Sequence, residues 1–163
     1  MKSLPPNAEK IFTISQLLMK TAEWKAQGKK LVFTNGCFDI LHRGHLEILN
    51  TSAGFGDILV VGMNSDDSVK RLKGDHRPIN DEGFRSQMMA SLNMVDAVCL
   101  FTEDTPLQLI QLLHPDVLVK GGDYTLSQVI GADDIIQHGG EVKIVPLVKG
   151  YSTSALIEAI QRL

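Results

Sequence analysis

The fold is decided by one stretch of sequence: Lys30-Leu31-Val32-Phe33-Thr34-Asn35-Gly36-Cys37-Phe38-Asp39-Ile40-Leu41-His42-Arg43-Gly44-His45. It begins as the short apolar run of a buried strand, turns at a glycine, and enters a helix through two histidines three residues apart. The first N–H groups of a helix lack partners within it and lie at the positive end of its dipole. A strand that leads directly into such a helix therefore predicts a phosphate-binding site.

Outward from this stretch, short apolar runs alternate with segments of helical character. We expect five strands, at residues 31–34, 58–63, 97–101, 117–119 and 142–145. The alternation is typical of an α/β protein, and we predict a single Rossmann-like domain with a five-stranded parallel sheet, in the order 3-2-1-4-5, flanked by helices. Residues 1–12 are predicted to form an N-terminal arm and residues 13–163 the folded domain. In that order strands one and four are neighbours, so the segments 35–45 and 120–124 would face each other across one crevice.

The composition is that of an ordinary globular chain. Of the 163 residues 44% are hydrophobic and 21% are charged, and the formal net charge is -3. This balance argues against binding to nucleic acid or to a membrane through a basic surface. Cys37 and Cys99 form no paired motif, which suits a reducing compartment. No signal peptide or membrane span is recognisable, and we expect a cytoplasmic protein.

His42 and His45 carry the chemistry of the predicted site. Residues three apart share a helix face, and two imidazoles beside free helix N–H groups would stabilise charge that develops on a phosphate. Gly44 removes a side chain where the phosphate must approach closely. The plain alternative is a pair of surface histidines. A zinc site is less favoured because no third and fourth ligand lies nearby in the sequence, so no metal ligand is predicted. The sequence also contains no P-loop and no complete dinucleotide fingerprint.

Several motifs together resemble a known family. His42-Arg43-Gly44-His45, following Asn35-Gly36-Cys37-Phe38-Asp39, resembles the HxGH signature of the cytidylyltransferase-like nucleotidyltransferase superfamily. With the segments 64–74, 77–80 and Val119-Lys120-Gly121-Gly122-Asp123-Tyr124, the chain resembles the D-glycero-D-manno-heptose 1-phosphate adenylyltransferase family over residues 10–163. Bifunctional members of that family also carry a sugar kinase domain. This chain is too short for one, so the resemblance implies a stand-alone transferase domain.

The resemblance implies a reaction and its partners. ATP and a heptose 1-phosphate would give ADP-heptose and pyrophosphate, a precursor step for lipopolysaccharide or another surface glycan. ATP would be a substrate bound with Mg²⁺, a separate heptose kinase would act upstream, and a homodimer is expected from the family. Two alternatives remain open: a cytidylyltransferase for glycerol 3-phosphate or a related alcohol phosphate, and a non-catalytic nucleotide-binding regulatory module.

The candidate site follows from the motifs and the resemblance. The predicted catalytic residues are His42, His45 and Lys120. The predicted nucleotide-binding residues are Thr34, Asn35, Gly36, Cys37, Phe38, Gly44, Arg85, Ser152, Thr153 and Ser154. The last three resemble the superfamily's second signature, a Ser-Thr-Ser turn at a helix N-terminus. The predicted residues for the sugar phosphate are Asp39, Lys70, Lys73, Arg77, Gly121, Gly122, Asp123 and Tyr124.

Plain alternatives exist for these assignments. Arg85 suits an ordinary surface arginine equally well, Asp39 could simply order its loop, and the Lys70–Arg77 region could be a solvated basic turn. The segment 120–124 could be a glycine turn, and Ser152 a helix cap.

Many relatives place a basic residue shortly after the Ser-Thr-Ser turn. Here Ala155-Leu156-Ile157-Glu158 follow it. Lys143 and Lys149 are the candidates to supply that charge instead.

Overall fold

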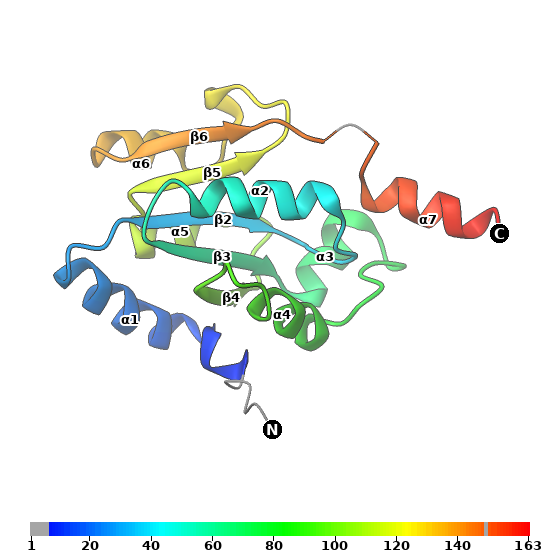
Figure 1. The fold of residues 1–163 in the computed structure, drawn as a ribbon, viewed down its shortest axis with the longest axis horizontal. Helices are drawn as coiled ribbons and strands as arrows, with labels where there is room; N and C mark the ends of the chain where they lie inside the picture. Colours follow the sequence, from blue (N-terminus) through cyan, green and yellow to red (C-terminus); the bar gives the residue numbers. More distant parts are fainter. Residues whose placement is uncertain (1–6, 149) are drawn as a thin grey trace.

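A computed structural model describes residues 7–148 and 150–163, and within them the chain builds one parallel sheet with helices on both faces (Figure 1). The sheet has six described strands in the order β1-β4-β3-β2-β5-β6, and each neighbouring pair runs parallel. The strands are β1 (Ile11–Phe12), β2 (Leu31–Gly36), β3 (Ile58–Asn64), β4 (Ala97–Phe101), β5 (Val117–Gly121) and β6 (Glu141–Val145).

The prediction of a five-stranded sheet in the order 3-2-1-4-5 is wrong. The additional strand is β1, which pairs with Val98 and Cys99 at the edge of the sheet. It comes from residues that were expected to belong to an N-terminal arm, of which residues 1–6 lie outside the described part. A two-residue strand is too short to show the alternation or the apolar run by which strands are recognised in a sequence.

Seven α-helices are described, together with two short 3₁₀ segments. The α-helices are α1 (Ile14–Ala26), α2 (Arg43–Ala53), α3 (Asp66–Lys73), α4 (Glu82–Ala90), α5 (Leu107–Leu113), α6 (Ala132–Gln137) and α7 (Thr153–Gln161); the 3₁₀ segments are η1 (Asn7–Lys10) and η2 (Leu126–Gln128). Thr13 and Gln16 form a capping box at the start of α1. Ser152 caps α7 by accepting a hydrogen bond from the Ala155 N–H at 3.1 Å. None of these helices is long and apolar enough to cross a membrane.

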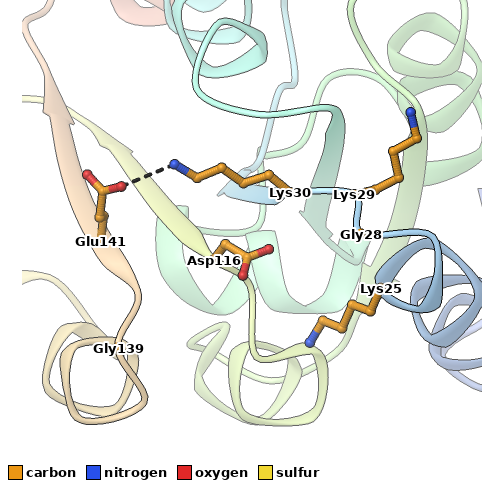
Figure 2. A pocket seen from close by; sticks show the side chains of 7 residues that line it. All are labelled: Lys25, Gly28, Lys29, Lys30, Asp116, Gly139 and Glu141. Carbon is orange, nitrogen blue, oxygen red and sulfur yellow. Dashed lines mark hydrogen bonds and ion pairs between the residues drawn. The ribbon is translucent and has the colours of Figure 1, made fainter.

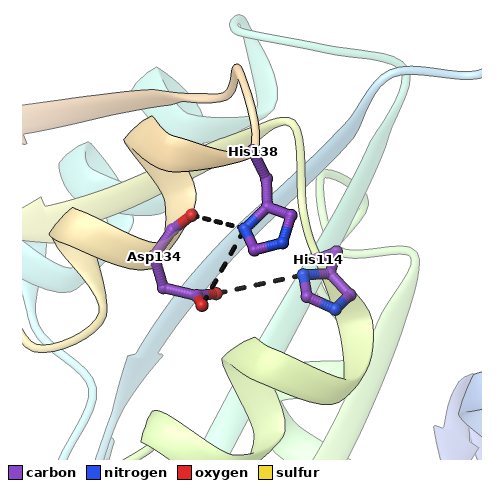
Figure 3. Close-up of side chains that lie close together, drawn as sticks. All are labelled: His114, Asp134 and His138. Carbon is purple, nitrogen blue, oxygen red and sulfur yellow. Dashed lines mark hydrogen bonds and ion pairs between the residues drawn. The ribbon is translucent and has the colours of Figure 1, made fainter.

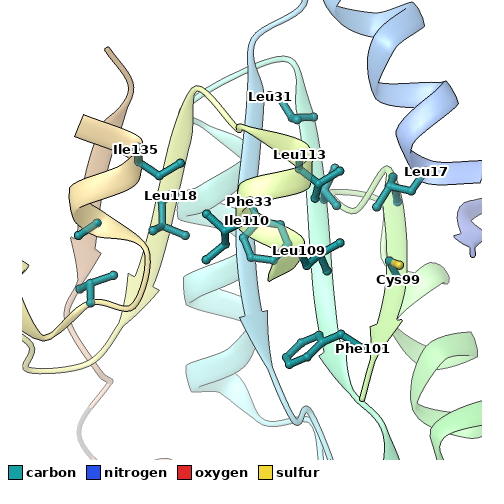
Figure 4. Close-up of a cluster of buried hydrophobic side chains, with 14 residues drawn as sticks. Leu17, Leu31, Phe33, Cys99, Phe101, Leu109, Ile110, Leu113, Leu118 and Ile135 are labelled. Carbon is teal, nitrogen blue, oxygen red and sulfur yellow. The ribbon is translucent and has the colours of Figure 1, made fainter. Parts of the chain in front are cut away.

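The core consists of two apolar layers, one on each face of the sheet. One layer packs under α1, α5 and α6 and includes Leu17, Phe33 and Ile110, all fully buried (Figure 4). The other lies under α2 and α4 and includes Leu49 and Met89. Burial on both faces explains why the central strands appear in the sequence as continuous apolar runs.

The connections between the strands indicate where a ligand would bind. The connections that leave β2 and β3 cross the face covered by α2 and α4, whereas those that leave β4 and β5 cross the face covered by α5 and α6. The two kinds of connection diverge between β2 and β5, which are paired neighbours. Ligands of open parallel sheets bind beyond the carboxyl ends of strands at such a switch point.

Candidate active site

A cleft of about 560 Å³ lies at the carboxyl ends of β2 and β5. Its walls come from the end of β2, the first turn of α2, the end of α3, the end of β5 and the segment that enters α7. The predicted site residues that line it are Thr34, Asn35, Gly36, Cys37, Phe38, His42, Gly44, His45, Lys73, Lys120, Gly121, Tyr124 and Ser152. Segments far apart in the sequence therefore contribute to one cleft.

His42 and His45 lie against each other on one wall of this cleft. Their rings are stacked, with centroids 3.8 Å apart and planes 22° from parallel. His42 is the N-cap residue of α2, so both imidazoles lie at the positive end of that helix. The Nδ1 atom of each ring is buried and has no hydrogen-bond partner among the described residues. Two adjacent imidazoles that line the cleft at a helix N-terminus can bind an anionic ligand.

Two neighbouring residues hold the rings in place. Phe38 packs its ring edge against His45, with centroids 5.2 Å apart, and adopts a positive φ of 46° that is costly for an aromatic residue. Gly44 leaves room for the His42 ring, because a Cβ atom there would lie 3.0 Å from two of its atoms and 3.4 Å from the Tyr151 carbonyl oxygen. The lack of a side chain at Gly44 therefore leaves space for the ring of His42.

The electrostatics of the pair favour neutral rings in the free protein. The pKa of His45 is lowered to about 4, because burial, the neighbouring His42 and the Lys73 ammonium all disfavour the protonated ring. A hydrogen bond to the Ile40 backbone acts in the opposite direction. Burial also lowers the pKa of His42. Near neutral pH both imidazoles are uncharged, and an anionic ligand would favour the protonation that the free site opposes.

Two lysines supply positive charge from other parts of the cleft. Lys120 is the penultimate residue of β5, and its ammonium lies 5.4 Å from the centroid of the Tyr124 ring. Burial lowers the pKa of Lys120, and the nearby Cys37 opposes that shift. Lys73, at the end of α3, is close enough to depress protonation of His45. The cleft thus combines two neutral imidazoles with two ammonium groups.

Arg85, one of the predicted nucleotide-binding residues, lies inside the protein. It is buried, with 1% of its surface exposed, and does not line the cleft. Its guanidinium donates to the carbonyl oxygens of Cys37 (2.5 Å), Asn64 (2.9 Å) and Asn80 (3.0 Å), and to the Asp66 carboxylate at 2.8 Å. Arg85 therefore joins the ends of β2 and β3 beneath the cleft, which makes it a positioning residue in this structure.

Asp39 and Arg77 likewise form an internal network. The Asp39 carboxylate accepts hydrogen bonds from Arg77 Nε at 2.7 Å and from the N–H groups of Ile79 and Asn80 at 2.9 Å. Burial alone would raise the pKa of Asp39, but these donors hold it below its usual value. Neither Asp39 nor Arg77 lines the cleft. Their contacts fasten the loop between α3 and α4 to the end of β2.

The remaining predicted residues do not line the cleft. Gly122 has a φ of 139°, a conformation that favours glycine, and directs the chain from β5 toward Tyr124. The other residues of this kind are Lys70, Asp123, Thr153 and Ser154. Lys143 pairs with Glu141 at 2.7 Å and also does not line the cleft, while Lys149 lies outside the described residues.

The structure adds residues that the sequence analysis did not select. Asn64 ends β3, lines the cleft, and donates to Ser68 Oγ at 3.0 Å. Tyr151 also lines the cleft, and its ring lies 5.6 Å from the Arg43 guanidinium carbon. Asp104 is the one carboxylate among the described lining residues, and it pairs with Arg71 at 2.7 Å. Asn64 lay within a motif that carried the resemblance, whereas Asp104 and Tyr151 had no signal in the sequence.

A second hollow lies at the amino ends of the strands (Figure 2), and its character is different. Lys30 pairs with Glu141 at 3.1 Å, and Asp116 accepts a hydrogen bond from the Leu31 N–H at 2.7 Å. Lys25 donates to the carbonyl oxygens of Leu113 and His114, at 2.7 and 2.8 Å. These charged groups have partners within the protein, so the carboxyl-end cleft is the better candidate for a ligand site.

Comparison with known proteins identifies relatives over most of the chain. The "Bifunctional protein HldE" of Koribacter versatilis is 52% identical over 157 residues, which cover 96% of this chain and 32% of that protein. The protein of the same name from Geobacter metallireducens is 54% identical over 138 residues, covering 85% of this chain and 28% of that protein. The chain thus spans about a third of the length of these curated relatives.

Solved structures and a family model agree with these relatives. The lipopolysaccharide core biosynthesis protein from Thermoplasma volcanium is 34% identical, with a TM-score of 0.60 over 77% of this chain and 100% of its own. The pantoate-beta-alanine ligase from Francisella tularensis, 15% identical with a TM-score of 0.61 over 94% of this chain and 79% of its own, shares the fold. The cytidylyltransferase-like family model matches residues 33–159, which confirms the resemblance indicated by the histidine motif. The chain therefore belongs to the cytidylyltransferase-like family of nucleotidyltransferases.

Proposed function

We propose that this chain transfers AMP from ATP to a heptose 1-phosphate, giving ADP-heptose and pyrophosphate. The observation that carries the proposal is the stacked His42–His45 pair, with both Nδ1 atoms buried and unpartnered, in one cleft with Lys73 and Lys120. Relatives named HldE, at about half identity, and the solved lipopolysaccharide core biosynthesis protein support the choice of sugar.

The proposed reaction requires alignment and charge stabilisation. An oxygen of the sugar phosphate attacks the α-phosphorus of ATP, the bond from that phosphorus to the bridging oxygen breaks, and pyrophosphate leaves with the electron pair. The sugar phosphate is already an anion, so no general base is needed. His42, His45 and the helix N–H groups would stabilise the charge that grows on the phosphates. Lys120, which lines the same cleft, would hold the two anionic reactants close together.

Mg²⁺ would enter with the nucleotide. Asp104, the carboxylate that lines the described part of the cleft, is paired with Arg71, so the phosphate oxygens and water would supply most of the ligands of the ion. Bound Mg²⁺ supplies additional charge neutralisation on the triphosphate. The residues of this chain would orient the complex and exclude water from it.

The proposal also covers the source of the sugar phosphate, the cellular compartment and the oligomeric state. The bifunctional relatives support a sugar kinase, on a partner or elsewhere in a longer chain, as the source of the heptose 1-phosphate. The use of ATP and the two free cysteines, Cys37 and Cys99, support action in the cytoplasm. Dimerisation stays a prediction, which analytical ultracentrifugation would test.

The direct experiment is pyrophosphate release from a panel of nucleotides and phosphorylated acceptors. We expect turnover with ATP and D-glycero-D-manno-heptose 1-phosphate, and none with CTP and glycerol 3-phosphate. The reverse pattern would assign the chain to alcohol-phosphate cytidylyltransferases. ATP binding by calorimetry, without pyrophosphate from any acceptor, would indicate a regulatory module instead.

A further inference from the structure

We infer that His114, Asp134 and His138 form a binding site for a divalent transition metal ion such as Zn²⁺. The three side chains lie close together at the surface, and one ligand atom from each falls within 4.8 Å of the others (Figure 3). His114 Nδ1 lies 3.9 Å from Asp134 Oδ2, and His138 Nδ1 lies 3.8 Å from Asp134 Oδ1. The two rings are 4.7 Å apart between centroids.

The Asp134 carboxylate lacks the partner that a buried oxygen normally has. Its Oδ2 atom is buried and accepts no hydrogen bond from any described residue. His114 Nδ1 faces the carboxylate at 3.9 Å, a distance too long for a hydrogen bond but suitable for an ion between the two atoms. A buried oxygen without a donor is rare in a folded protein and needs an explanation, which a bound cation supplies.

His138 is oriented as metal-binding histidines usually are. Its Nδ1 atom lies 2.8 Å from the Asp134 carbonyl oxygen. A proton on Nδ1 that is donated to this oxygen leaves the Nε2 lone pair free, and in Figure 3 that second nitrogen points toward His114. An imidazole whose other nitrogen donates to a backbone carbonyl has a fixed orientation and tautomer, which favours metal binding.

His114 is held in an unusual backbone conformation. It ends α5 with φ 42° and ψ 63°, in the left-handed region where Gly and Asn are the usual residues. Lys25 donates to its carbonyl oxygen at 2.8 Å, which helps to hold the chain there. The conformation brings the His114 ring to the two ligands on α6. Strained residues of this kind occur at ligand sites, where the surrounding structure maintains them.

The ligand set indicates the kind of ion. Two imidazoles and one carboxylate suit Zn²⁺ and similar transition metal ions, whereas Mg²⁺ and Ca²⁺ prefer oxygen ligands. Three protein ligands leave a fourth position of a tetrahedral Zn²⁺ for water. The ion would join the end of α5 to α6, two helices that pack on the same face of the sheet beside β5. We therefore assign the site a stabilising role, separate from the cleft at the opposite end of β5.

The experiment is zinc binding to the full chain, stripped of metal and freed of any histidine tag. Isothermal titration calorimetry should give one site with micromolar or tighter affinity in the presence of millimolar Mg²⁺. Saturating zinc should raise the melting temperature by roughly 4 °C. Co²⁺ should give the visible absorption bands of a four-coordinate ion at the same stoichiometry.

Two variants and a control locate the ion. Asp134→Asn keeps the side-chain shape, and His114→Asn keeps a residue that tolerates the left-handed conformation; each should weaken zinc binding by about 10²-fold. His76→Asn, at an exposed histidine elsewhere, should bind zinc as the parent chain does. Wild-type affinity in the Asp134→Asn chain, or no zinc binding by the parent chain, would overturn the proposal. Neither result would affect the adenylyl transfer assay, because the two sites use different residues.

Discussion

Two pairs of histidines lie at opposite ends of the sheet, and their neighbours give them different chemistry. His42 and His45 stack 3.8 Å apart where β2 leads into α2, with Lys73 and Lys120 lining the same cleft. His114 and His138 lie 4.7 Å apart near the amino ends of β5 and β6, and they share a carboxylate, Asp134. The same residue type is thus combined with ammonium groups at one end and with an acid at the other.

The comparison teaches that the neighbours of an imidazole pair decide which ligand it suits. A helix N-terminus and nearby lysines favour an anion and keep His45 neutral in its absence. A carboxylate between two imidazoles favours a cation. We therefore propose that the pair in the cleft binds the triphosphate of the proposed reaction and that the pair at the opposite end binds a metal ion.

The largest expected effect follows from removing one imidazole of the cleft pair. His45→Ala should lower kcat for pyrophosphate release by about 10²–10³-fold, the usual cost of losing one group that stabilises a developing oxyanion. The melting temperature should fall by only a few degrees, from the loss of the ring contacts with His42 and Phe38 and of the hydrogen bond to the Ile40 backbone. His76→Gln is the control, at an exposed histidine outside the cleft, and should retain parental activity. Comparable activity in the His45 variant would remove the pair from its proposed role.

A smaller effect is expected from displacing the other ring. Gly44→Ala places a methyl group 3.0 Å from two His42 ring atoms, so the ring must shift. A displacement of this size should reduce kcat/KM by about 10–10²-fold. Gly54→Ala is the matched control, since it lies at the opposite end of the same helix and has αR geometry. Equal losses in both variants would mean that the effect comes from the helix and not from His42.

The buried, neutral state of His45 should appear in the acid stability of the protein. Its pKa is about 4 when folded and near the ordinary 6.5 when unfolded, so the unfolded chain binds more protons between these values. The free energy of unfolding should therefore fall as the pH decreases from 6.5 toward 4, by roughly 2 kcal/mol from this residue. Chemical denaturation of the parent chain and of His45→Gln would measure the difference. Parallel pH profiles for the two chains would contradict it.

The smallest effect is expected from placing a carboxylate near the His42–His45 pair, which should weaken the preference of the cleft for an anion. Lys73→Glu replaces the nearby ammonium with an acid, which should raise the pKa of His45 and weaken ATP binding by about tenfold. Lys29→Glu makes the same change of net charge at the amino ends of the strands and serves as the control in calorimetry. If both variants lose the same affinity, net charge is responsible, and the position of Lys73 is not.

The sequence predicted the local features of the cleft because they are encoded by adjacent residues. The strand, the glycine turn and the histidines of the first stretch are continuous in the chain. The edge strand β1 was missed because two residues carry no pattern. The layers of the sheet followed from apolar runs, which depend only on burial.

Contacts between distant residues could not be predicted in this way. Arg85 was expected to bind nucleotide, but its hydrogen bonds reach residues 37, 64, 66 and 80 and place it beneath the cleft. The second histidine pair shows the same limit: Asp134 and His138 have helical spacing, yet His114 joins them only through the packing of α5 beside α6. A conformation at His114 that is unusual for its residue type completes the cluster.

The measurement that tests the comparison most directly is an NMR titration that follows the imidazole resonances of all five histidines. Addition of a non-hydrolysable ATP analogue with Mg²⁺ should shift the signals of His42 and His45 and raise the pKa of His45 from about 4. The signals of His114 and His138 should not shift. Addition of Zn²⁺ should shift His114 and His138 alone. Nucleotide-induced shifts at His114 and His138, or none at His42 and His45, would contradict the account.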